Sequence, residues 1–276
     1  MIITEPIAVE KIAIAIKNLP PRLSGTKIVQ LSDLHYDGVR LATETLEQAI
    51  ALSNKANPDL VLITGDFITD NPQPIQELAM QLKKLTSKHG VFGCLGNHDL
   101  VPPASGGIII KALAKINLKI LWNEVVYPLG AGLAIAGLPD FWSREFKPAE
   151  VFSQIPQDIP RLVLSHNPDS AQVLQQWRVD LQLSGHTHGG QIVIPHYGPV
   201  LSLLPKIRKH VPRPLRNRLP YIKDCAKVTI NWRWASGWHQ VKQNQLYVNR
   251  GLGTYRPGRF NCPPEVTVIT LESWSG

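Results

Sequence analysis

The first hundred residues alternate between short apolar runs and amphipathic segments, and this alternation restricts the fold more than any other feature. Residues 26–38, 59–67 and 91–99 each contain an apolar run that leads into a polar loop with an aspartate. Segments 41–59 and 74–90 carry apolar residues at helical spacing. The order strand, helix, strand, helix, strand predicts βαβαβ units with a mostly parallel sheet.

The second half is richer in strands. Strand-like runs cover residues 132–140, 161–169, 180–194, 245–254 and 265–274, and a short helix is expected over 170–177. These runs predict a second sheet packed on the first. Neither a repeat nor a low-complexity linker divides the 276 residues, so we expect one domain over 1–276, with residues 199–240 as an excursion from its core.

Polar residues of a few types stand at the ends of five predicted strands. They are Asp33 and His35, Asp66, Asn97 to Asp99, His166, and His186 with His188. Ligands of open α/β sheets bind beyond the carboxyl ends of the strands, so we expect these side chains to converge. Imidazole, carboxylate and amide oxygen without thiolate suit manganese, iron, zinc or cobalt. The donors outnumber the needs of one ion, which favours a pair of ions that share a carboxylate.

Each motif also has an ordinary structural interpretation. "DLH" is compatible with a solvated turn, "GD" is a common turn, and "GNHD" and "SHNP" are compatible with a polar turn and a helix cap. "GHTHGG" is harder to explain in this way, because glycines flank both histidines and leave them without steric cover. Five such motifs in one order, each after an apolar strand, favour a common site.

The series "DLH", "GD", "GNHD", "H" and "GHTH" resembles the signature of the calcineurin-like metallophosphoesterases, and the tail "NRGLGT" to "VTVITL" resembles a bacterial branch of them. The resemblance implies a four-layer α/β/β/α sandwich of two mixed sheets flanked by helices. It also implies ligands for two metal ions. Asp33, His35 and His188 would bind the first ion, Asn97, His166 and His186 the second, and Asp66 both.

The resemblance also implies hydrolysis of a phosphoester, with in-line attack by a hydroxide that bridges two divalent ions, manganese being favoured. His98 is the expected general acid or a stabiliser of the phosphoryl oxygens. Asp99 is placed to orient His98, with a structural turn as the equal alternative. Because His98 can protonate a poor leaving group, we favour a phosphodiesterase over a monoesterase. Arg250 is expected to contact phosphate, with a surface cation as the alternative.

Positive charge is concentrated in one segment. The net charge is +8, and residues 201–223 contain seven lysines and arginines and no acidic residue. Apolar residues are interleaved with these cations, and Trp232, Trp234 and Trp238 follow them. This composition suits an element that meets an anionic membrane surface or a lipidic or nucleotide phosphodiester, as in the similar UDP-2,3-diacylglucosamine hydrolases. A solvated basic loop around core tryptophans is the alternative.

A nuclease and a non-catalytic scaffold are the two alternative functions. A nuclease would use the basic segment for nonspecific affinity, but the segment resembles no groove-reading module, so nucleic acid is an unlikely partner. A non-catalytic scaffold on the same fold would lack metal ligands, whereas every ligand position is filled here. No obligate protein partner is evident.

The N-terminus lacks a signal peptide, no apolar run is long enough to span a bilayer, and the three cysteines Cys94, Cys225 and Cys262 share no close spacing. We therefore expect a cytoplasmic protein, peripheral to the inner membrane if it meets lipid.

Overall fold

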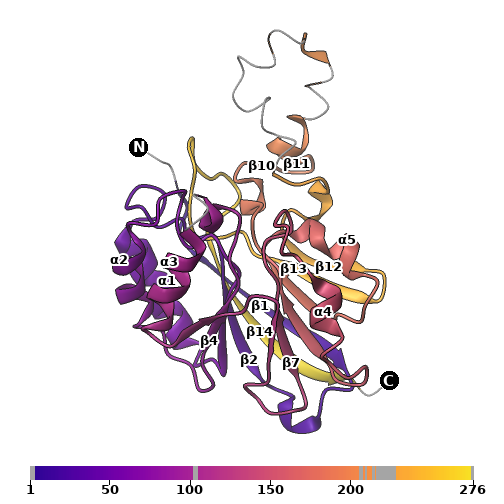
Figure 1. The fold of residues 1–276 in the computed structure, drawn as a ribbon. Coiled ribbons are helices and arrows are strands. Elements are labelled where there is room, and N and C mark those ends of the chain that lie inside the picture. The colour runs from indigo at the N-terminus through magenta and orange to yellow at the C-terminus, as the bar shows by residue number, and fades with distance from the viewer. Residues whose placement is uncertain are drawn as a thin grey trace.

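The computed structural model describes residues 4–101, 105–204, 208, 210–212, 215 and 228–274. Two six-stranded mixed sheets lie face to face, as predicted (Figure 1). The first sheet has the order β1 (Ala8–Lys17), β14 (Glu265–Trp274), β2 (Lys27–Leu31), β3 (Leu60–Ile63), β4 (Val91–Gly93) and β5 (Leu118–Ile120). The second has the order β12 (Gly237–Val241), β13 (Asn244–Val248), β9 (Leu181–Ser184), β8 (Arg161–Leu164), β7 (Ala134–Gly137) and β6 (Glu124–Val126).

Helices cover the outer face of each sheet, which confirms the predicted four layers. Helices α1 (Thr43–Lys55), α2 (Ile75–Leu82) and α3 (Ser105–Ala114) lie on the first sheet, and α4 (Pro148–Phe152) and α5 (Ala171–Leu174) lie on the second (Figure 1). The β2–α1–β3–α2–β4 order is the predicted βαβαβ arrangement, with parallel pairing of β2, β3 and β4.

Side-chain alternation along the strands explains why the layers form. In β3, Val61 and Ile63 pack toward the helices, whereas Leu60 and Leu62 pack between the sheets. In β8, Leu162 and Leu164 join the core between the sheets and Val163 joins the core beneath α4. A strand that is apolar on both faces must be covered on both, so each sheet acquires a helix layer and a sheet partner.

One strand lies in a different sheet from the one expected. Residues 265–274, which the sequence pattern predicts in the second sheet, form β14 and lie in the first sheet between β1 and β2. It pairs in parallel with β1 and antiparallel with β2. Period-two alternation identifies a strand but does not encode its neighbours, and this is why the sequence pattern misplaced it.

The excursion predicted for residues 199–240 is described only in part. Strand β11 (Gly198–Pro199), which pairs with β10 (Val193–Ile194), and the 3-10 helix Trp232–Trp234 lie beyond the ends of the sheet strands (Figure 1). Residues 237–240 belong instead to β12 of the second sheet, so the predicted range extends too far into the core. Six of the predicted cations, Lys206, Lys209, Arg213, Arg216, Arg218 and Lys223, lie outside the described residues, as does Cys225. Within the described ranges, no helix is long and apolar enough to cross a membrane.

Candidate metal centre

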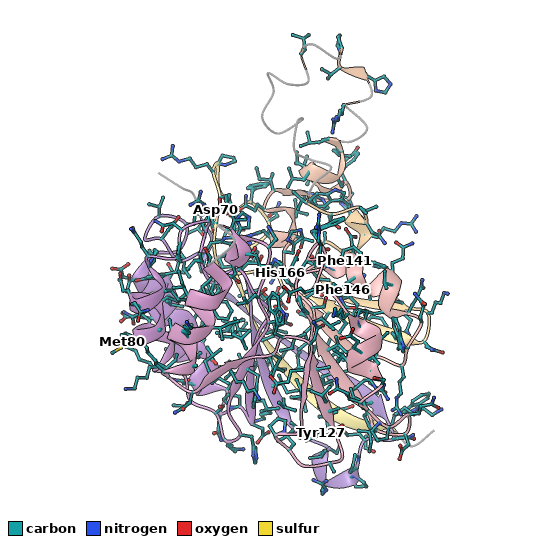
Figure 2. All side chains as sticks on the ribbon, in the orientation of Figure 1. Asp70, Met80, Tyr127, Phe141, Phe146 and His166 are labelled. Atoms are coloured by element: carbon teal, nitrogen blue, oxygen red, sulfur yellow. The ribbon has the colours of Figure 1, made fainter. Side chains whose placement is uncertain are left out.

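The strands bring all five motifs to one place between the two sheets. Asp33 and His35 follow β2, Asp66 follows β3 and Asn97 follows β4, while His166 follows β8 and His186 and His188 follow β9. The parallel strands of each sheet end at the same edge, so loops from both halves of the chain meet there. His166 lies in the middle of the molecule, and Asp70 lies nearer the surface (Figure 2).

Asp33, His35 and His188 form the first group, with donor atoms that all lie within 4.8 Å of one another. The Nε2 atoms of His35 and His188 are 3.1 Å apart, and Nε2 of His188 is 3.4 Å from Oδ1 of Asp33. Ligands of an ion about 2.1 Å away lie roughly 3.0 Å apart in octahedral and 3.4 Å apart in tetrahedral geometry. The donor spacing therefore fits one metal ion.

Asp66, His166 and His186 form the second group by the same criterion. Oδ2 of Asp66 is 3.1 Å from Nε2 of His166, which is 3.2 Å from Nδ1 of His186. The same carboxylate oxygen is 3.4 Å from Nε2 of His35 in the first group. Asp66 thus lies between the groups, at the place where a shared ligand is expected.

Outward hydrogen bonds determine which nitrogen of each imidazole faces inward. Nδ1 of His166 donates to the Thr64 carbonyl at 2.6 Å, and Nδ1 of His188 donates to the Gly253 carbonyl at 3.0 Å. The Nε2 of His186 donates to the Val228 carbonyl, so its Nδ1 faces His166. The inward-facing nitrogens carry lone pairs, which repel one another unless a cation or a proton lies between them. An outward N–H bonded to a carbonyl and an inward lone pair are the usual arrangement of a metal-binding histidine.

The electrostatics of the buried groups also favour positive charge. Asp33 and Asp66 are almost completely buried. Burial by itself lowers the pKa of His166, but Asp66 and the neighbouring carboxylates outweigh it and raise that pKa to about 10. Burial lowers the pKa of His35 well below its usual value, which keeps this imidazole neutral and able to act as a ligand.

Backbone strain is concentrated in the same loops. Asp33, His35, Asp66, His186 and His188 all have positive φ, between 44° and 72°. Residues other than glycine rarely adopt this conformation, and it persists where the surrounding structure enforces it. Here it turns the side chains at the strand ends inward, and it lets His186 and His188 reach different donor groups.

Glycines make the close approach possible. A Cβ atom on Gly96 would lie 2.2 Å from Oδ1 of Asp66, and one on Gly185 would lie 1.9 Å from Oγ of Ser32 and 2.2 Å from Oδ2 of Asp33. Any side chain at Gly96 or Gly185 would therefore displace one of the two buried carboxylates. Because these two glycines lack a Cβ atom, the loop backbone can lie directly against the carboxylates.

Asn97 and His98 lie next to the second group. Oδ1 of Asn97 is buried and has no hydrogen-bond partner in the described structure, as expected for an amide oxygen kept for a cation. The His98 backbone N–H donates to Oδ1 of Asp66 at 2.9 Å. Its ring packs edge-on against His35, with centroids 4.9 Å apart, while 29% of its side chain is exposed. His98 is thus beside the groups and open to a substrate.

The prediction that Asp99 orients His98 is wrong. Nδ1 of His98 is 2.7 Å from Oδ1 of Asp70, in the loop after β3. The Asp99 carboxylate instead accepts backbone N–H groups of Phe67, Ile68 and Gly96. Asp99 ties together the loops that carry Asp66 and Asn97, which is the structural role that the sequence left open.

The prediction that Arg250 contacts phosphate is not supported. Its guanidinium pairs with Glu265, at 2.8 Å from Nε to Oε2, and with Glu10 at 2.5 Å. These two carboxylates belong to β14 and β1, so Arg250 joins the second sheet to the first. A guanidinium held by two carboxylates contributes little to phosphate binding.

Sequence reasoning missed Arg259 and Tyr255. Arg259 is 2% exposed, and its guanidinium donates to the carbonyls of His188, Gly251 and Gly253, among others. The Tyr255 hydroxyl is 3.2 Å from Nδ1 of His35, and its ring packs on His35 and His188. Both residues follow the last motif by more than sixty positions, and no spacing signal connects them to it.

Arg259→Lys is expected to destabilise the protein. Lysine cannot reproduce the fork of donors that holds several buried carbonyls, so we expect a loss of about 2–4 kcal/mol in the free energy of unfolding. Urea titration would measure it, with Arg233→Lys, an exposed arginine, as the matched control. Equal stability of both variants would contradict a structural role for Arg259.

Comparisons with known proteins agree with this geometry. A family model described as calcineurin-like phosphoesterase matches residues 26–190, more than half of the chain. The chain is 34% identical to the uncharacterized metallophosphoesterase YkuE of Bacillus subtilis, covering 98% of this chain and 87% of that protein. It is 30% identical to the phosphodiesterase YaeI of Escherichia coli, covering 89% and 82%. It is 28% identical to the UDP-2,3-diacylglucosamine pyrophosphatase LpxG of Chlamydia muridarum, covering 90% and 84%.

Proposed function

The chain belongs to the calcineurin-like phosphoesterase family and is a phosphoester hydrolase, and from this premise we propose that it is a binuclear phosphodiesterase or pyrophosphatase that acts on a lipidic or nucleotide-linked substrate. The observation that carries the binuclear proposal is the pair of donor groups with Asp66 between them. A single ion would leave the inward-facing imidazole nitrogens of the other donor group without a cation between them.

The proposed ligands are those that the sequence suggested. Asp33, His35 and His188 would hold one ion, Asn97, His166 and His186 the other, and Asp66 both. Manganese is our first candidate, because the donors are imidazole, carboxylate and amide oxygen, and neither of the described cysteines belongs to a donor group. When bound, two divalent ions lower the pKa of coordinated water and neutralise phosphoryl oxygens.

His98 is the proposed proton donor to the leaving oxygen. Its ring lies beside His35, its side chain is partly exposed, and its Nδ1 faces the Asp70 carboxylate. The hydrogen bond to Asp70 leaves Nε2 as the nitrogen that presents a proton to substrate, and it stabilises the charged imidazolium. Asp70 is therefore a positioning residue that acts through His98.

Asp70→Asn is expected to reduce kcat by roughly tenfold near neutral pH and to shift the alkaline limb of the pH profile to lower pH. Burial lowers the pKa of His98, but the carboxylates of Asp66 and Asp70 outweigh it and raise that pKa. An acid must hold its proton, so activity is present below the pKa of His98 and lost as pH rises through it. Removing the Asp70 charge lowers this pKa, so activity is lost at a lower pH.

The pH dependence of kcat would be measured for wild type and for Asp70→Asn, with Asp37→Asn as the control. Asp37 lies in the loop after β2 and pairs with Arg40. Asparagine tolerates the positive φ of 52° that Asp70 adopts, so the backbone should be preserved. An alkaline limb at the same pH in all three proteins would rule out Asp70 as the support of His98.

The substrate class rests on two observations. A relative that covers most of this chain is named as a UDP-2,3-diacylglucosamine pyrophosphatase, and large apolar side chains are exposed beside the site. Ile194, Tyr197 and Phe260 are 40%, 75% and 59% exposed. Backbone hydrogen bonds join Tyr197 to Ile194 and Phe260 to Val193, so these side chains share one region. We propose that the excursion predicted within residues 199–240, up to the start of β12 at Gly237, caps the single domain and, with this region, meets an anionic membrane or a lipidic substrate.

Vesicle sedimentation would test the membrane contact. We expect wild-type protein to bind vesicles that contain phosphatidylglycerol more strongly than vesicles of phosphatidylcholine alone, and the double variant Tyr197→Ser, Phe260→Ser to bind about tenfold more weakly. Met80→Ser, a 62% exposed residue on α2, is the control (Figure 2). Equal binding by all three proteins would contradict the proposed surface.

Turnover assays would test the substrate class separately. We expect hydrolysis of a UDP-linked diacylated sugar and of bis-p-nitrophenyl phosphate, with slower hydrolysis of p-nitrophenyl phosphate. Robust cleavage of plasmid or single-stranded DNA without turnover of the lipid-linked nucleotide would instead assign a nuclease.

A further inference from the structure

The outward nitrogen of His35 contacts side chains, unlike the outward nitrogens of the other histidines in the two donor groups. Each of those three histidines donates to a backbone carbonyl. Nδ1 of His35 is instead 3.1 Å from Oγ1 of Thr69 and 3.2 Å from the hydroxyl oxygen of Tyr255. Its Nε2 faces Nε2 of His188 and Oδ2 of Asp66, at 3.1 and 3.4 Å. When Nε2 serves as a ligand, Nδ1 carries the proton, and the two hydroxyl groups are its acceptors.

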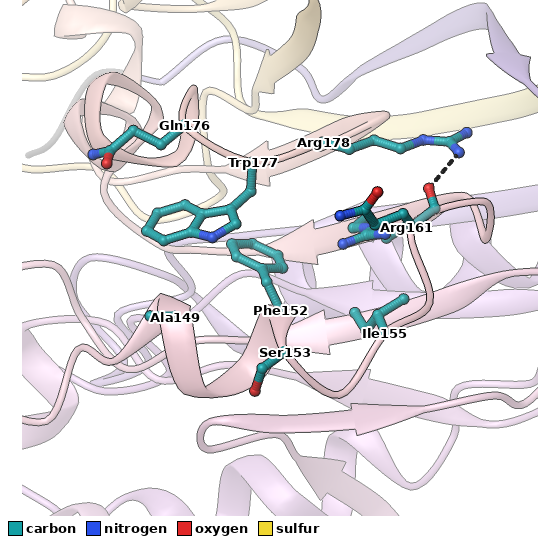
Figure 3. Close-up of a pocket in the computed structure, with 9 residues that line it drawn as sticks. Ala149, Phe152, Ser153, Ile155, Arg161, Gln176, Trp177 and Arg178 are labelled. Carbon is teal, nitrogen blue, oxygen red and sulfur yellow. Dashed lines mark hydrogen bonds between the residues drawn. The ribbon is translucent and has the colours of Figure 1, made fainter.

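The Tyr255 ring lies against the first donor group. Its centroid is 5.1 Å from the ring centroid of His35 and 5.3 Å from that of His188, with an edge-on geometry in both cases. Within the described chain, the ring contacts that do not involve histidine join only phenylalanines and tryptophans, such as Phe152 and Trp177 in the cavity at α4 (Figure 3). Among the residues that the structure describes, Tyr255 is therefore the one aromatic side chain other than histidine that is placed to support these ligands.

Contacts within the protein fix Tyr255 in this position. The Gln191 side chain accepts the backbone N–H of Tyr255 at 2.6 Å and donates to its carbonyl at 3.4 Å. Cζ of Arg40 lies 4.7 Å from the centroid of the Tyr255 ring, where the face of the ring attracts a cation. Gln191 directly follows the "GHTHGG" motif, so the loop that carries His188 also holds Tyr255. A side chain held in this way can orient a neighbouring ligand.

We propose that Tyr255 and Thr69 are positioning residues for the first ion, because their hydroxyl oxygens accept the Nδ1–H of His35 and keep its Nε2 directed into the first donor group. This inference rests on the proposed binuclear function. Loss of the hydrogen bond to the outer nitrogen of a metal-binding histidine weakens metal binding by about 10- to 100-fold. Since two oxygens share one N–H, loss of both hydroxyl groups should exceed the loss of either. The effect should be confined to the first ion, because backbone carbonyls hold His166 and His186 of the second group.

Titration of the whole, metal-free protein with Mn²⁺ would test the proposal, with electron paramagnetic resonance to measure the free ion. We expect wild type to bind two ions per chain. Tyr255→Phe and Thr69→Val should each weaken the binding of one ion by about tenfold, and the double variant should weaken it by about 100-fold, with the other ion unaffected. Thr69→Ser keeps the hydroxyl group and should bind both ions as wild type does. Tyr127→Phe is the control, because it removes a hydroxyl group from a 37% exposed tyrosine far from His166 (Figure 2).

The stoichiometry of wild type and the affinities of the variants separate this inference from the proposed function. Two ions in wild type, bound equally well by Tyr255→Phe and by the double variant, would overturn the positioning role and leave the binuclear proposal intact. Fewer than two ions in wild type would overturn both. Weaker binding of both ions, together with a lower thermal midpoint of the metal-free variant, would show a structural role and would also overturn the inference. If Tyr255→Phe does not fold, the comparison of Thr69→Val with Thr69→Ser decides the question, and equal affinities would overturn the proposal.

Discussion

Asp66→Asn is expected to abolish phosphoesterase activity, with a loss in kcat of roughly 10³-fold or more. The Asp66 carboxylate lies within 3.4 Å of donors in both groups, and it is buried. Asparagine preserves its shape but removes the negative charge that two cations would share. Metal content by mass spectrometry should fall from two ions per chain, and turnover of bis-p-nitrophenyl phosphate should fall with it.

Asp37→Asn is the matched control for this substitution, because it changes the same side chain outside both donor groups. We expect it to keep both metal content and turnover. If Asp66→Asn retained two ions per chain at wild-type kcat, the binuclear proposal would be excluded. If the wild-type protein neither bound metal nor hydrolysed the ester, the scaffold alternative would be correct.

His98→Gln is expected to lower kcat by about 10²- to 10⁴-fold while leaving two ions per chain. His98 belongs to neither donor group, so metal affinity should survive its loss. A proton donor matters most when the leaving oxygen is basic. The loss should therefore be greater for an alkyl phosphodiester than for bis-p-nitrophenyl phosphate, whose leaving group departs without a proton.

His89→Gln, which changes an exposed histidine, is the control for His98→Gln. Equal losses with both leaving groups would assign His98 to stabilisation of phosphoryl oxygens rather than to proton donation. Loss of metal in His98→Gln would show that it supports the ions, contrary to our assignment.

The family, the layered fold and the convergence of the ligand candidates were predictable from sequence because local patterns encode them. Runs such as 60–63 are apolar on both faces, which requires cover on both. Parallel strands end at the same edge of a sheet, so the polar residue that follows each strand is expected to lie at that edge. Asp33, Asp66 and His166 therefore meet although they are far apart in the chain.

The partner of His98 was not predictable, since two aspartates compete for the role. Asp99 is adjacent in sequence, but successive residues of the short helix His98–Leu100 do not face one another. Asp70 comes from another loop and reaches Nδ1 of His98 through a turn with positive φ. Proximity in sequence favours Asp99, whereas the direction of the backbone brings the Asp70 carboxylate to His98.

The family, the two covered sheets and the residue types at the strand ends are thus predictable from the sequence alone, because they depend on local periodicity and on the shared direction of parallel strands. The insertion of β14 between β1 and β2, the pairing of Arg250 with Glu10 and Glu265, and the support of the His188 loop by Arg259 become visible in the folded structure. Such contacts depend on strand order and loop direction, which arise from the packing of distant segments and leave no local pattern.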